Sequence, residues 1–366
     1  MEVPALLYKT PLYQNHIAQN ARMVNFCGWQ MPVQYDGIIA EYLACRKKAA
    51  VFDICHMGEF LLTGDLETSG LNRVMTCTLD NMKIKTCRYG LMLNEQGGVI
   101  DDLIVFRLSE KEYWLVVNAA NIDKDFAHLK KYLSLEADIK DKSTQTGKID
   151  LQGPVSREVL EIIIPGIEKL KYYQFDLFDI EGESCIVSRT GYTGELGYEI
   201  FLPSEKTKKM WEKLLENDNV KSAGLGARDV LRIEMGYSLY GHEINDEISP
   251  IESGLEKFVD FSKEFVGKEA LRVQTGKTPR RKIIYLVSDT RRAPRQGQKV
   301  FTQENKEIGY ITSGTFSPEF QKGIGIALVS CAGIEESDKM LFGDSKKYFA
   351  ATKYQKPFYK KGSYKI

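Results

Sequence analysis

The sequence has few of the residues that build disulfide frameworks and metal sites. Its seven cysteines are odd in number and none lies in a C-x-x-C pair, and its four histidines include no H-E-x-x-H arrangement. This scarcity argues against a secreted disulfide scaffold and a zinc ribbon, and it favours buried free thiols. The sequence therefore offers no candidate metal ligands.

Long apolar runs are also missing, since none approaches the ~18 residues that a membrane span requires. The opening residues, MEVPALLYKTPLY, have neither the charged and apolar regions of a secretory signal nor an Arg- and Ser-rich presequence. We therefore expect a protein of the cytoplasm, or of the mitochondrial matrix if the source is eukaryotic and the chain already processed. No membrane partner is expected.

Neither sign of charge prevails overall, because 50 Lys and Arg balance 50 Asp and Glu in 366 residues. The distribution is uneven: residues 276–366 hold 18 basic and 8 acidic side chains, against 32 and 42 in residues 1–275. A basic C-terminal quarter suits an acidic partner or a polyanionic ligand. Its Lys residues alternate with Tyr and Phe, which leaves single-stranded nucleic-acid binding as an alternative. The acidic body and the pI of about 6.9 argue against nucleic acid.

Hydrophobic periodicity predicts helices in the acidic body. They are expected over 36–50, 205–217 and 227–236. In the first of them, Ile39, Tyr42, Leu43 and Arg46 are expected to fall on one side. The body is therefore not all-β.

Strand signals predict a β-meander and a separate β-domain. The meander is expected over 88–120, with turns at NEQGG and SEKE. From about residue 281, short β-rich runs are separated by Gly, Pro and charged residues, which is typical of an all-β module. The polar stretch QTGKTPRR (274–281) is expected to be the linker. The class is therefore α+β with a C-terminal β-domain.

The middle meander strand, over 99–108, contains two adjacent carboxylates. Because side chains alternate along a strand, Asp102 shares a face with Ile104 and Phe106, and Asp101 points to the other face. The two carboxylates are therefore not expected to serve one site. A carboxylate among apolar side chains is poorly solvated, so its pKa is expected to rise. The alternative is a strand-end Asp that caps a nearby turn.

A glycine-rich segment, SRTGYTGELGYEIFL (188–202), has three glycines spaced by three and flanked by aromatic residues. The spacing predicts a tight turn between strands where the backbone closely approaches another group. Beyond the turn, Glu199 and Phe201 are expected to face the same way. A carboxylate there can accept two in-plane N–H bonds from a guanidine-like heterocycle edge. An exposed Glu on a glycine hairpin is the alternative.

The segment GLGARDVLRIEMG (224–236) begins with two glycines before a predicted helix. It lacks the third glycine of a dinucleotide fingerprint, so nucleotide binding is poorly supported. Arg228 would lie in the first helical turn, where the helix dipole disfavours a cation. We therefore expect a specific partner for Arg228, and a structural salt bridge is the simplest version, with Asp229 adjacent.

Taken in order, these segments resemble the aminomethyltransferase, or T-protein, family of the glycine cleavage system. The resemblance covers almost the whole chain, in the family's order and spacing, through TPLYQNH, ARMVNFCGWQMPVQY, VFDICHMGE, NEQGGVIDDLIV, LQGP, RTGYTGELGYEI, GLGARDVLRIEMGYSLYGHEI, FVGKEAL and EIGYITSGTFSP. It implies transfer of the methylene of an aminomethyl group, carried on lipoylated H-protein, to the co-substrate tetrahydrofolate. The implied products are 5,10-methylenetetrahydrofolate, ammonia and dihydrolipoyl H-protein.

The resemblance also implies which residues form the site. The catalytic aspartate matches Asp102, and the pterin-recognising acid matches Glu199, with Arg228 as its partner and Tyr192 nearby. The other folate-lining positions match Met57, Tyr89, Ile104, Phe106, Val116 and Asn118. Whether Asp102 accepts a proton, or orients the nitrogen and stabilises developing positive charge, stays open.

The implied fold is a three-domain cloverleaf with folate in its central opening. The first domain is discontinuous, over 1–55 and 140–245; the second holds the meander, over 56–139 and 246–275; the third is the β-domain, over 276–366. Composition alone indicates only the last of these boundaries.

Two rival readings stay within the same fold. Folate-binding modules of dimethylglycine and sarcosine oxidases carry a flavin-binding portion, for which 366 residues leave no room. Folate-dependent factors of iron–sulfur cluster assembly show a K-G-C-Y-x-G-Q-E type of segment where this chain has FVGKEAL (265–271), without a cysteine. The iron–sulfur factor is kept as the alternative function.

Overall fold

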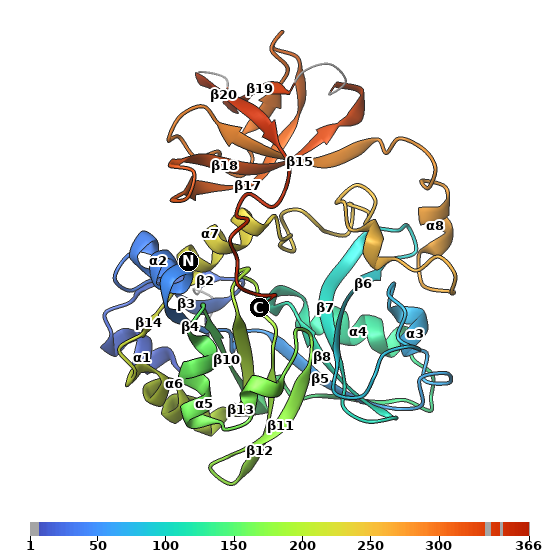
Figure 1. Ribbon diagram of the computed structural model, residues 1–366. Helices are drawn as coiled ribbons and strands as arrows, with labels where there is room; N and C mark the ends of the chain where they lie inside the picture. Colours follow the sequence, from blue (N-terminus) through green and yellow to red (C-terminus); the bar gives the residue numbers. More distant parts are fainter. Residues whose placement is uncertain (1–6, 334–337, 345–346, 366) are drawn as a thin grey trace, which may run out of the picture.

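The computed structural model describes residues 7–333, 338–344 and 347–365. It contains a six-stranded sheet, a five-stranded sheet, a three-stranded sheet and a closed barrel. The barrel stands above two lobes built on the larger sheets (Figure 1). This agrees with the expected α+β class, while the three domain boundaries stay predictions. Residues 1–6, part of the segment from which we expect neither a secretory signal nor a presequence, lie outside the described residues.

The six-stranded sheet has the order β11-β12-β13-β10-β4-β14 and is antiparallel except between β14 and β4. Its strands are β11 (Phe175–Ile180), β12 (Glu183–Ser188), β13 (Gly197–Pro203), β10 (Thr146–Gln152), β4 (Ala49–Asp53) and β14 (Val220–Ser222). One face buries apolar side chains against helices α5 (Ser156–Ile163) and α6 (Thr207–Leu215). The opposite face is left to line the centre of the molecule.

Two helices cover part of that second face. They are α2 (Ile38–Lys47) and α7 (Leu225–Met235), which pack on β4 through one apolar cluster. The four residues expected on one side of α2 differ in burial, because Tyr42 and Arg46 are buried while Ile39 is 49% and Leu43 36% exposed. Arg46 is buried because two carboxylates neutralise it. Periodicity counts apolar residues and cannot anticipate such a paired charge.

The five-stranded sheet has the order β6-β7-β8-β5-β9 and is antiparallel throughout. Its strands are β6 (Cys87–Leu93), β7 (Val99–Arg107), β8 (Glu112–Val117), β5 (Gly58–Thr63) and β9 (Asp138–Asp141). The expected meander is confirmed, although its last strand ends at Val117 and a short 3-10 helix, Ala119–Asn121, follows. Helices α3 (Leu71–Val74) and α4 (Ile122–Tyr132) cover one face.

The remaining face of the five-stranded sheet packs against the six-stranded sheet. A single apolar cluster joins Phe106 and Val116 of the first sheet to Ile186 and Phe201 of the second. Rings of Phe106 and Phe201 meet at 5.4 Å, edge to face. The site described below therefore lies between the two sheets.

The C-terminal module is a closed barrel of the order β15-β18-β17-β16-β19-β20. Its strands are β15 (Arg281–Ser288), β18 (Lys322–Ser330), β17 (Glu307–Ser317), β16 (Lys299–Phe301), β19 (Lys339–Asp344) and β20 (Lys347–Tyr354). The expected β-domain is confirmed, and β19 is the strand that the sequence reading missed. Ile324 and Ile326 of β18 pack on Ile233 of α7, so this helix joins the barrel to the body.

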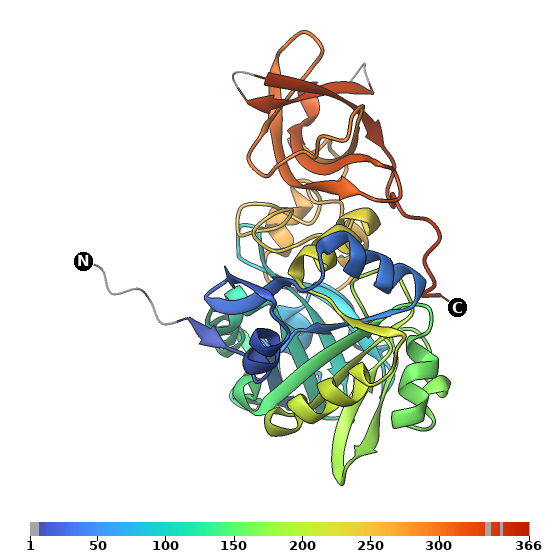
Figure 2. The same cartoon turned by 90° about the vertical axis from the view of Figure 1, so that its left-hand side faces the viewer.

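A strap of residues 355–365 leaves the barrel and returns to the six-stranded lobe (Figure 2). The backbone N–H of Tyr359 donates to the carbonyl of Glu234 at 3.0 Å. Near its end, Ser363 donates from both N and Oγ to Glu195 Oε2, at 3.0 and 2.6 Å. The strap therefore fastens the barrel to the body a second time.

Smaller elements complete the fold. The three-stranded sheet joins β1 (Tyr8–Lys9), β3 (Trp29–Gln34) and β2 (Arg22–Phe26), and the short helices are α1 (Tyr13–Ala18) and α8 (Lys268–Arg272). All seven cysteines are free, and six are buried as expected, whereas Cys27 is exposed. In the part of the chain that the structure describes, no helix combines the length and apolarity of a membrane crossing.

Candidate active site

The meander strand β7 places Asp102 toward the centre of the molecule. The Tyr89 hydroxyl donates to its Oδ2 at 3.0 Å, and the Asn118 side-chain amide donates to its Oδ1 at 2.8 Å. Three residues given by sequence therefore meet at one carboxylate. The alternative of a strand-end Asp that caps a turn is wrong, because Asp102 lies within a paired strand.

The surroundings of Asp102 raise its pKa to about 7. Burial is the largest cause, and the neighbouring Asp101 adds to it, while the bonds from Tyr89 and Asn118 oppose it. The expected rise is thus confirmed. A carboxyl group with a pKa near 7 is able both to accept and to return a proton at neutral pH.

Asp101 points to the other face, as strand alternation predicts, and is fully buried. It is nevertheless tied to the site, because the Asn118 amide also donates to Asp101 Oδ1 at 2.9 Å and its backbone N–H donates to Oδ2 at 2.9 Å. Asn121 adds a third donor at 2.6 Å. The expectation that only one of the pair serves the site is therefore incomplete, since Asp101 fixes the amide that binds Asp102.

Apolar side chains surround this carboxylate on the expected face. Ile104, Phe106, Val116 and Met57 belong to the cluster that joins the two sheets. The side chains of Leu103 and Val105, one position out of phase, pack in the opposite core. The alternation predicted from sequence is therefore confirmed, and it places apolar side chains on the same face as Asp102.

Glu199 lies on β13, on the face of the six-stranded sheet that lines the centre. It is only 5% exposed, so the alternative of an exposed Glu is wrong. Thr190 Oγ1 donates to its Oε2 at 2.6 Å, and Lys148 Nζ lies 3.8 Å from its Oε1. Phe201 faces the same way, as expected, whereas Tyr198 and Ile200 pack in the opposite core.

Arg228 has a specific partner, as expected, but the partner is Asp150. Its Nη1 lies 2.6 Å from Asp150 Oδ2, a fully buried carboxylate on β10 directly opposite Glu199. Burial, followed by Glu199, raises the pKa of Asp150 to about 6, against the opposing charge of Arg228. The adjacent Asp229 instead pairs with Arg232 at 2.8 Å. Guanidinium has five N–H donors, so Arg228 retains others for a ligand.

The glycine-rich segment forms an eight-residue loop, 189–196, and not the tight turn expected. Its close approach is real: a Cβ at Gly191 or Gly197 would lie 2.2 or 2.1 Å from the amide of Gln152. That amide donates to Asp150 Oδ1 at 2.6 Å and to the carbonyl of Thr190 at 3.0 Å. The glycines therefore let one buried amide fix the partners of both Arg228 and Glu199.

Tyr192 connects the two halves of the site. Its ring stacks on Tyr237 with centroids 5.6 Å apart, and the Arg228 guanidinium lies 5.1 Å from its centroid. Its hydroxyl donates to the carbonyl of Ser238. Burial is the main cause of its raised pKa, and Asp102 contributes. Tyr192 thus lies between the candidate catalytic carboxylate and the candidate pterin clamp.

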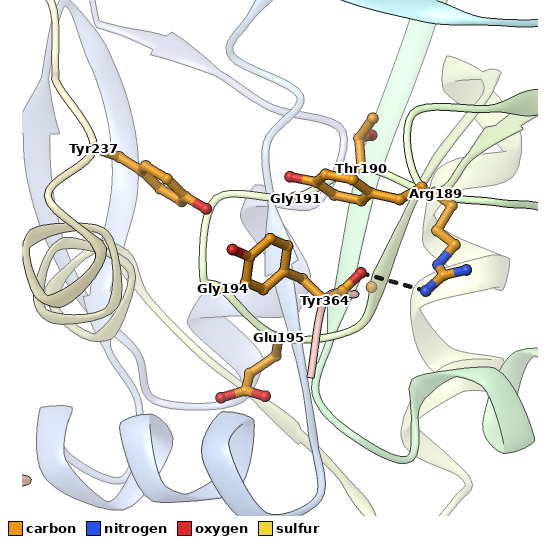
Figure 3. A pocket seen from close by; sticks show the side chains of 9 residues that line it. Arg189, Thr190, Gly191, Gly194, Glu195, Tyr237 and Tyr364 are labelled. Carbon is orange, nitrogen blue, oxygen red and sulfur yellow. Dashed lines mark hydrogen bonds between the residues drawn. The ribbon is translucent and has the colours of Figure 1, made fainter. Parts of the chain in front are cut away.

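A small cavity of about 10 Å3 adjoins Thr190, with room for about one water molecule at most. Tyr237 and Tyr364 point into it, and Glu195 lies at its lower side (Figure 3). The Arg189 guanidinium donates to the carbonyl of Tyr364 at 3.3 Å. The end of the strap therefore fills the space behind the glycine-rich loop.

Lys148 and Asp150 are the site residues that the sequence reading missed. They alternate with Ile149 and Leu151 in KIDLQ, a period of two that is typical of a strand with one polar face, and the structure buries that face. The pattern was available, but nothing in it says which charges lie opposite. Within residues 7–333, 338–344 and 347–365, no group of three His, Cys, Asp or Glu is placed to hold a metal ion.

Comparison with known proteins gives a consistent result. Residues 12–263 match the family described as GCVT N-terminal domain, and residues 281–360 match the glycine cleavage T-protein C-terminal barrel domain. The chain is 41% identical to an aminomethyltransferase of Pseudothermotoga lettingae over 336 residues, 91% of this chain and 92% of that protein. It is 40% identical to an aminomethyltransferase of Thermotoga neapolitana over 357 residues, 96% of this chain and 98% of that protein.

A solved structure extends the likeness to the whole fold. The glycine cleavage system aminomethyltransferase T from Bartonella henselae superimposes with a TM-score of 0.91 at 33% identity, covering 98% of this chain and 99% of that one. The expected three-domain cloverleaf fold is thereby confirmed.

Proposed function

The chain belongs to the glycine cleavage T-protein family, and on this premise we propose that Asp102, Glu199 and Arg228 form its folate site. Its relatives at about 40% identity are aminomethyltransferases, so the chain is a transferase of the glycine cleavage system that moves the methylene of an aminomethyl group to tetrahydrofolate. These relatives give no support to the iron–sulfur alternative. The observation that carries the site proposal is the Asp102 carboxyl, held by Tyr89 and Asn118 in apolar surroundings.

The reaction needs a group that handles protons. The S–CH2 and CH2–N bonds of the aminomethylated lipoyl arm break, and the carbon forms new bonds to N5 and N10 of the folate. The two N–H protons displaced from folate balance the two that complete ammonia and the lipoyl thiol. We assign the transfer of a folate proton to Asp102, because its pKa of about 7 suits both accepting and releasing one.

Recognition of the pterin falls to the opposite sheet. Glu199 presents an acceptor to the 2-amino and N3–H edge, which a carboxylate matches with two parallel hydrogen bonds. Arg228 borders the same space from α7, held by Asp150 and stacked over Tyr192. Met57, Ile104, Phe106 and Val116 supply the apolar walls. In this proposal the five-stranded sheet supplies the group that transfers protons, and the six-stranded sheet supplies the carboxylate that binds the pterin.

The test of the proposed function is a direct assay. Aminomethylated H-protein and tetrahydrofolate are mixed with the enzyme, and ammonia and 5,10-methylenetetrahydrofolate are measured together. We expect both products in equal amounts. Absence of both products with active H-protein would overturn the assignment.

Replacing Glu199 by Ala is expected to weaken tetrahydrofolate binding by about 100-fold, because two charge-assisted hydrogen bonds are lost. Turnover at saturating folate should change much less. Isothermal calorimetry of folate binding measures the first effect, with Glu183→Ala, an exposed residue of β12, as the matched control. An unchanged dissociation constant would contradict the pterin clamp.

The rate should depend on pH through Asp102. The group acts in its ionised form, so kcat/KM for ammonia release is expected to rise as the pH passes upward through about 7 and to level off above it. Initial rates between pH 5.5 and 8.5, at constant ionic strength, measure this profile. A profile that is flat across pH 7 would remove Asp102 from the proton transfer.

The H-protein that carries the lipoyl arm is proposed to dock on the basic barrel and on the lysine-rich strap that leaves it. Lys282, Lys353 and Lys356 line an open groove of about 470 Å3 on its surface, together with Tyr285 and Tyr354. Positive charge attracts an acidic carrier over a distance set by salt. The same positive charge would also attract the carboxylates of a folate tail. Charge reversal would raise the KM for H-protein if H-protein docks there, and the KM for tetrahydrofolate if the folate tail binds there.

Charge reversal at Lys360 and Lys361 is expected to raise the apparent KM for H-protein by about fivefold at low salt. The difference should vanish near 0.5 M salt, since screening removes long-range attraction. Steady-state kinetics measure both, with Lys208→Glu on α6 as the control at an exposed position of the body. An unaltered KM for H-protein would rule out docking at the strap.

A further inference from the structure

A buried lysine lies behind the candidate pterin clamp and has no role so far. Lys148 is 1% exposed and lies on β10, two residues before the Asp150 that pairs with Arg228. Its ammonium lies 3.8 Å from Glu199 Oε1, 3.6 Å from Met57 Sδ and 4.9 Å from the Phe201 ring centroid. A lysine is rarely buried this far unless it is paired.

The charges around Lys148 do not balance if every group is ionised. Three carboxylates, Glu59, Asp150 and Glu199, share this interior with two cations, Lys148 and Arg228. Arg228 is committed to Asp150 at 2.6 Å. The remaining cation, Lys148, therefore has two possible ionic partners, Glu59 and Glu199.

Glu59 is the acid whose negative charge is least compensated. It is 1% exposed, and among the described residues no donor lies within hydrogen-bond reach of either of its carboxylate oxygens. Burial raises its pKa well above the usual range for Glu, against the opposing charge of Lys148. Glu199, in contrast, already accepts a short bond from Thr190. The ionic partner of Lys148 is thus Glu199.

The distance between Lys148 and Glu199 has a chemical meaning. At 3.8 Å the ammonium stabilises the charge on Oε1, yet it lies beyond the range of a hydrogen bond and leaves the lone pairs of that oxygen free. Thr190 occupies Oε2 with one bond of the several that a carboxylate oxygen accepts. Glu199 is thereby charged but not saturated, which is the state that a donor-rich heterocycle edge requires.

From this geometry we infer that Lys148 is a positioning residue for the substrate, which holds Glu199 in the ionised form that accepts the two N–H groups of the pterin. The inference rests on the proposed folate site and adds to it the group that maintains its charge. Without Lys148, the buried carboxylate of Glu199 would face that of Asp150 with no cation at ion-pair distance among the described residues. A protonated Glu199 would present a donor where the ligand also has donors.

Other titratable groups also face Glu199 and belong in the account. Asp150 lies on the adjacent strand, paired with Arg228, and Glu59 lies on β5. Cys87 of the opposite sheet and Tyr173 of the loop before β11 also interact electrostatically with Glu199. Burial raises the pKa values of Cys87 and Tyr173 well above neutral, so both stay uncharged. Lys148 is therefore the cation whose removal most directly changes the charge at Glu199.

The experiment measures tetrahydrofolate binding by calorimetry from pH 5.5 to 8.5 in the full chain and its variants. In Lys148→Met, the pH below which binding is lost should move upward by about one to two units relative to the parent, since an opposite charge at this range shifts ionisation by that amount. Lys148→Arg should restore most of the parent profile. Asp102 titrates in all variants alike and does not affect the comparison.

Glu59→Gln serves as the matched control, because it imitates a protonated Glu59. It should bind folate with the parent pH profile. If Glu59→Gln moves the pH below which binding is lost downward, Glu59 is ionised in the parent and Lys148 serves Glu59, and the inference is overturned. If the parent binds folate while Lys148→Met binds it with an unchanged profile, the inference also fails and the folate site stands. If the parent binds no folate, the proposed site itself is wrong.

A second measurement covers the case in which Lys148→Met folds poorly. The loss of stability in Lys148→Met should be largely recovered in the double variant Lys148→Met/Glu199→Gln, because no buried carboxylate then lacks its cation. Denaturant unfolding at pH 8 gives both values. Equal losses in the single and the double variant would show a packing role alone and overturn the inference.

Discussion

Replacement of Asp102 by Asn is expected to lower turnover by about 10²- to 10⁴-fold, the range that general acid–base groups contribute. The amide keeps the size of the carboxyl and one acceptor for Asn118, so the geometry of the site should survive. It cannot accept a proton from folate. Ammonia release from aminomethylated H-protein measures the loss, and full turnover in Asp102→Asn would show that the carboxyl has no part in the chemistry.

The same substitution should make the protein more stable at alkaline pH. The pKa of Asp102 is raised in the folded state to about 7, above its unfolded value. The folded protein therefore gives up stability as the pH rises from about 4 through 7, and this cost is complete at pH 8. Asn carries no such cost, so the free energy of unfolding is expected to rise by about 1 to 3 kcal/mol at pH 8 and little at pH 4. A variant that loses both turnover and stability would indicate a structural defect instead.

Replacement of Arg46 by Met is expected to lower the free energy of unfolding by about 3 to 5 kcal/mol, because two buried carboxylates lose their cation. Arg46 lies 2.9 Å from Glu195 and 2.8 Å from Glu234, and all three side chains are almost fully buried. Its Nη1 also donates to the carbonyl of Thr193 at 2.7 Å, and its guanidinium stacks over Tyr359 at 3.7 Å. One side chain thus joins α2, the glycine-rich loop, α7 and the strap.

The control for Arg46 is a surface pair of the same chemistry. Arg272 lies 3.4 Å from Glu269, but both side chains are more than half exposed. Arg272→Met should leave the unfolding midpoint almost unchanged, since exposed ion pairs contribute little. Denaturant unfolding of both variants makes the comparison. A loss of less than about 1 kcal/mol in Arg46→Met would mean that water or a rearranged strap replaces the guanidinium.

Local patterns in the sequence predicted the half of the site that lies on the meander. Strand alternation placed Asp102 with Ile104 and Phe106, and the apolar neighbours predicted the raised pKa. These inferences succeeded because a strand fixes which side chains share a face over a few residues. The role of Asp101 was underestimated, because its contribution passes through Asn118 on another strand.

The half of the site on the six-stranded sheet was harder to predict. The register that places Asp150 opposite Glu199 joins segments about fifty residues apart, and nothing local encodes it. For that reason the sequence indicated Asp229 or Glu199, and not Asp150, as the partner of Arg228, and Lys148 was missed. The burial of Arg46 on α2 could not be predicted for a related reason, since it depends on carboxylates far along the chain.

The order of the strands sets how the protein folds. All strands of the five-stranded sheet come from residues 58–141, a continuous stretch with its own apolar core. In the six-stranded sheet, β4 pairs with β10 and β14, whose residues follow it by about 100 and 170 positions. Loops of that length make pairing slow, because the chain loses entropy before it gains contacts. We therefore expect the meander lobe to form early and to provide the surface on which the two separated parts of the neighbouring lobe meet, with the Asp102 side of the site assembled before the Glu199 side.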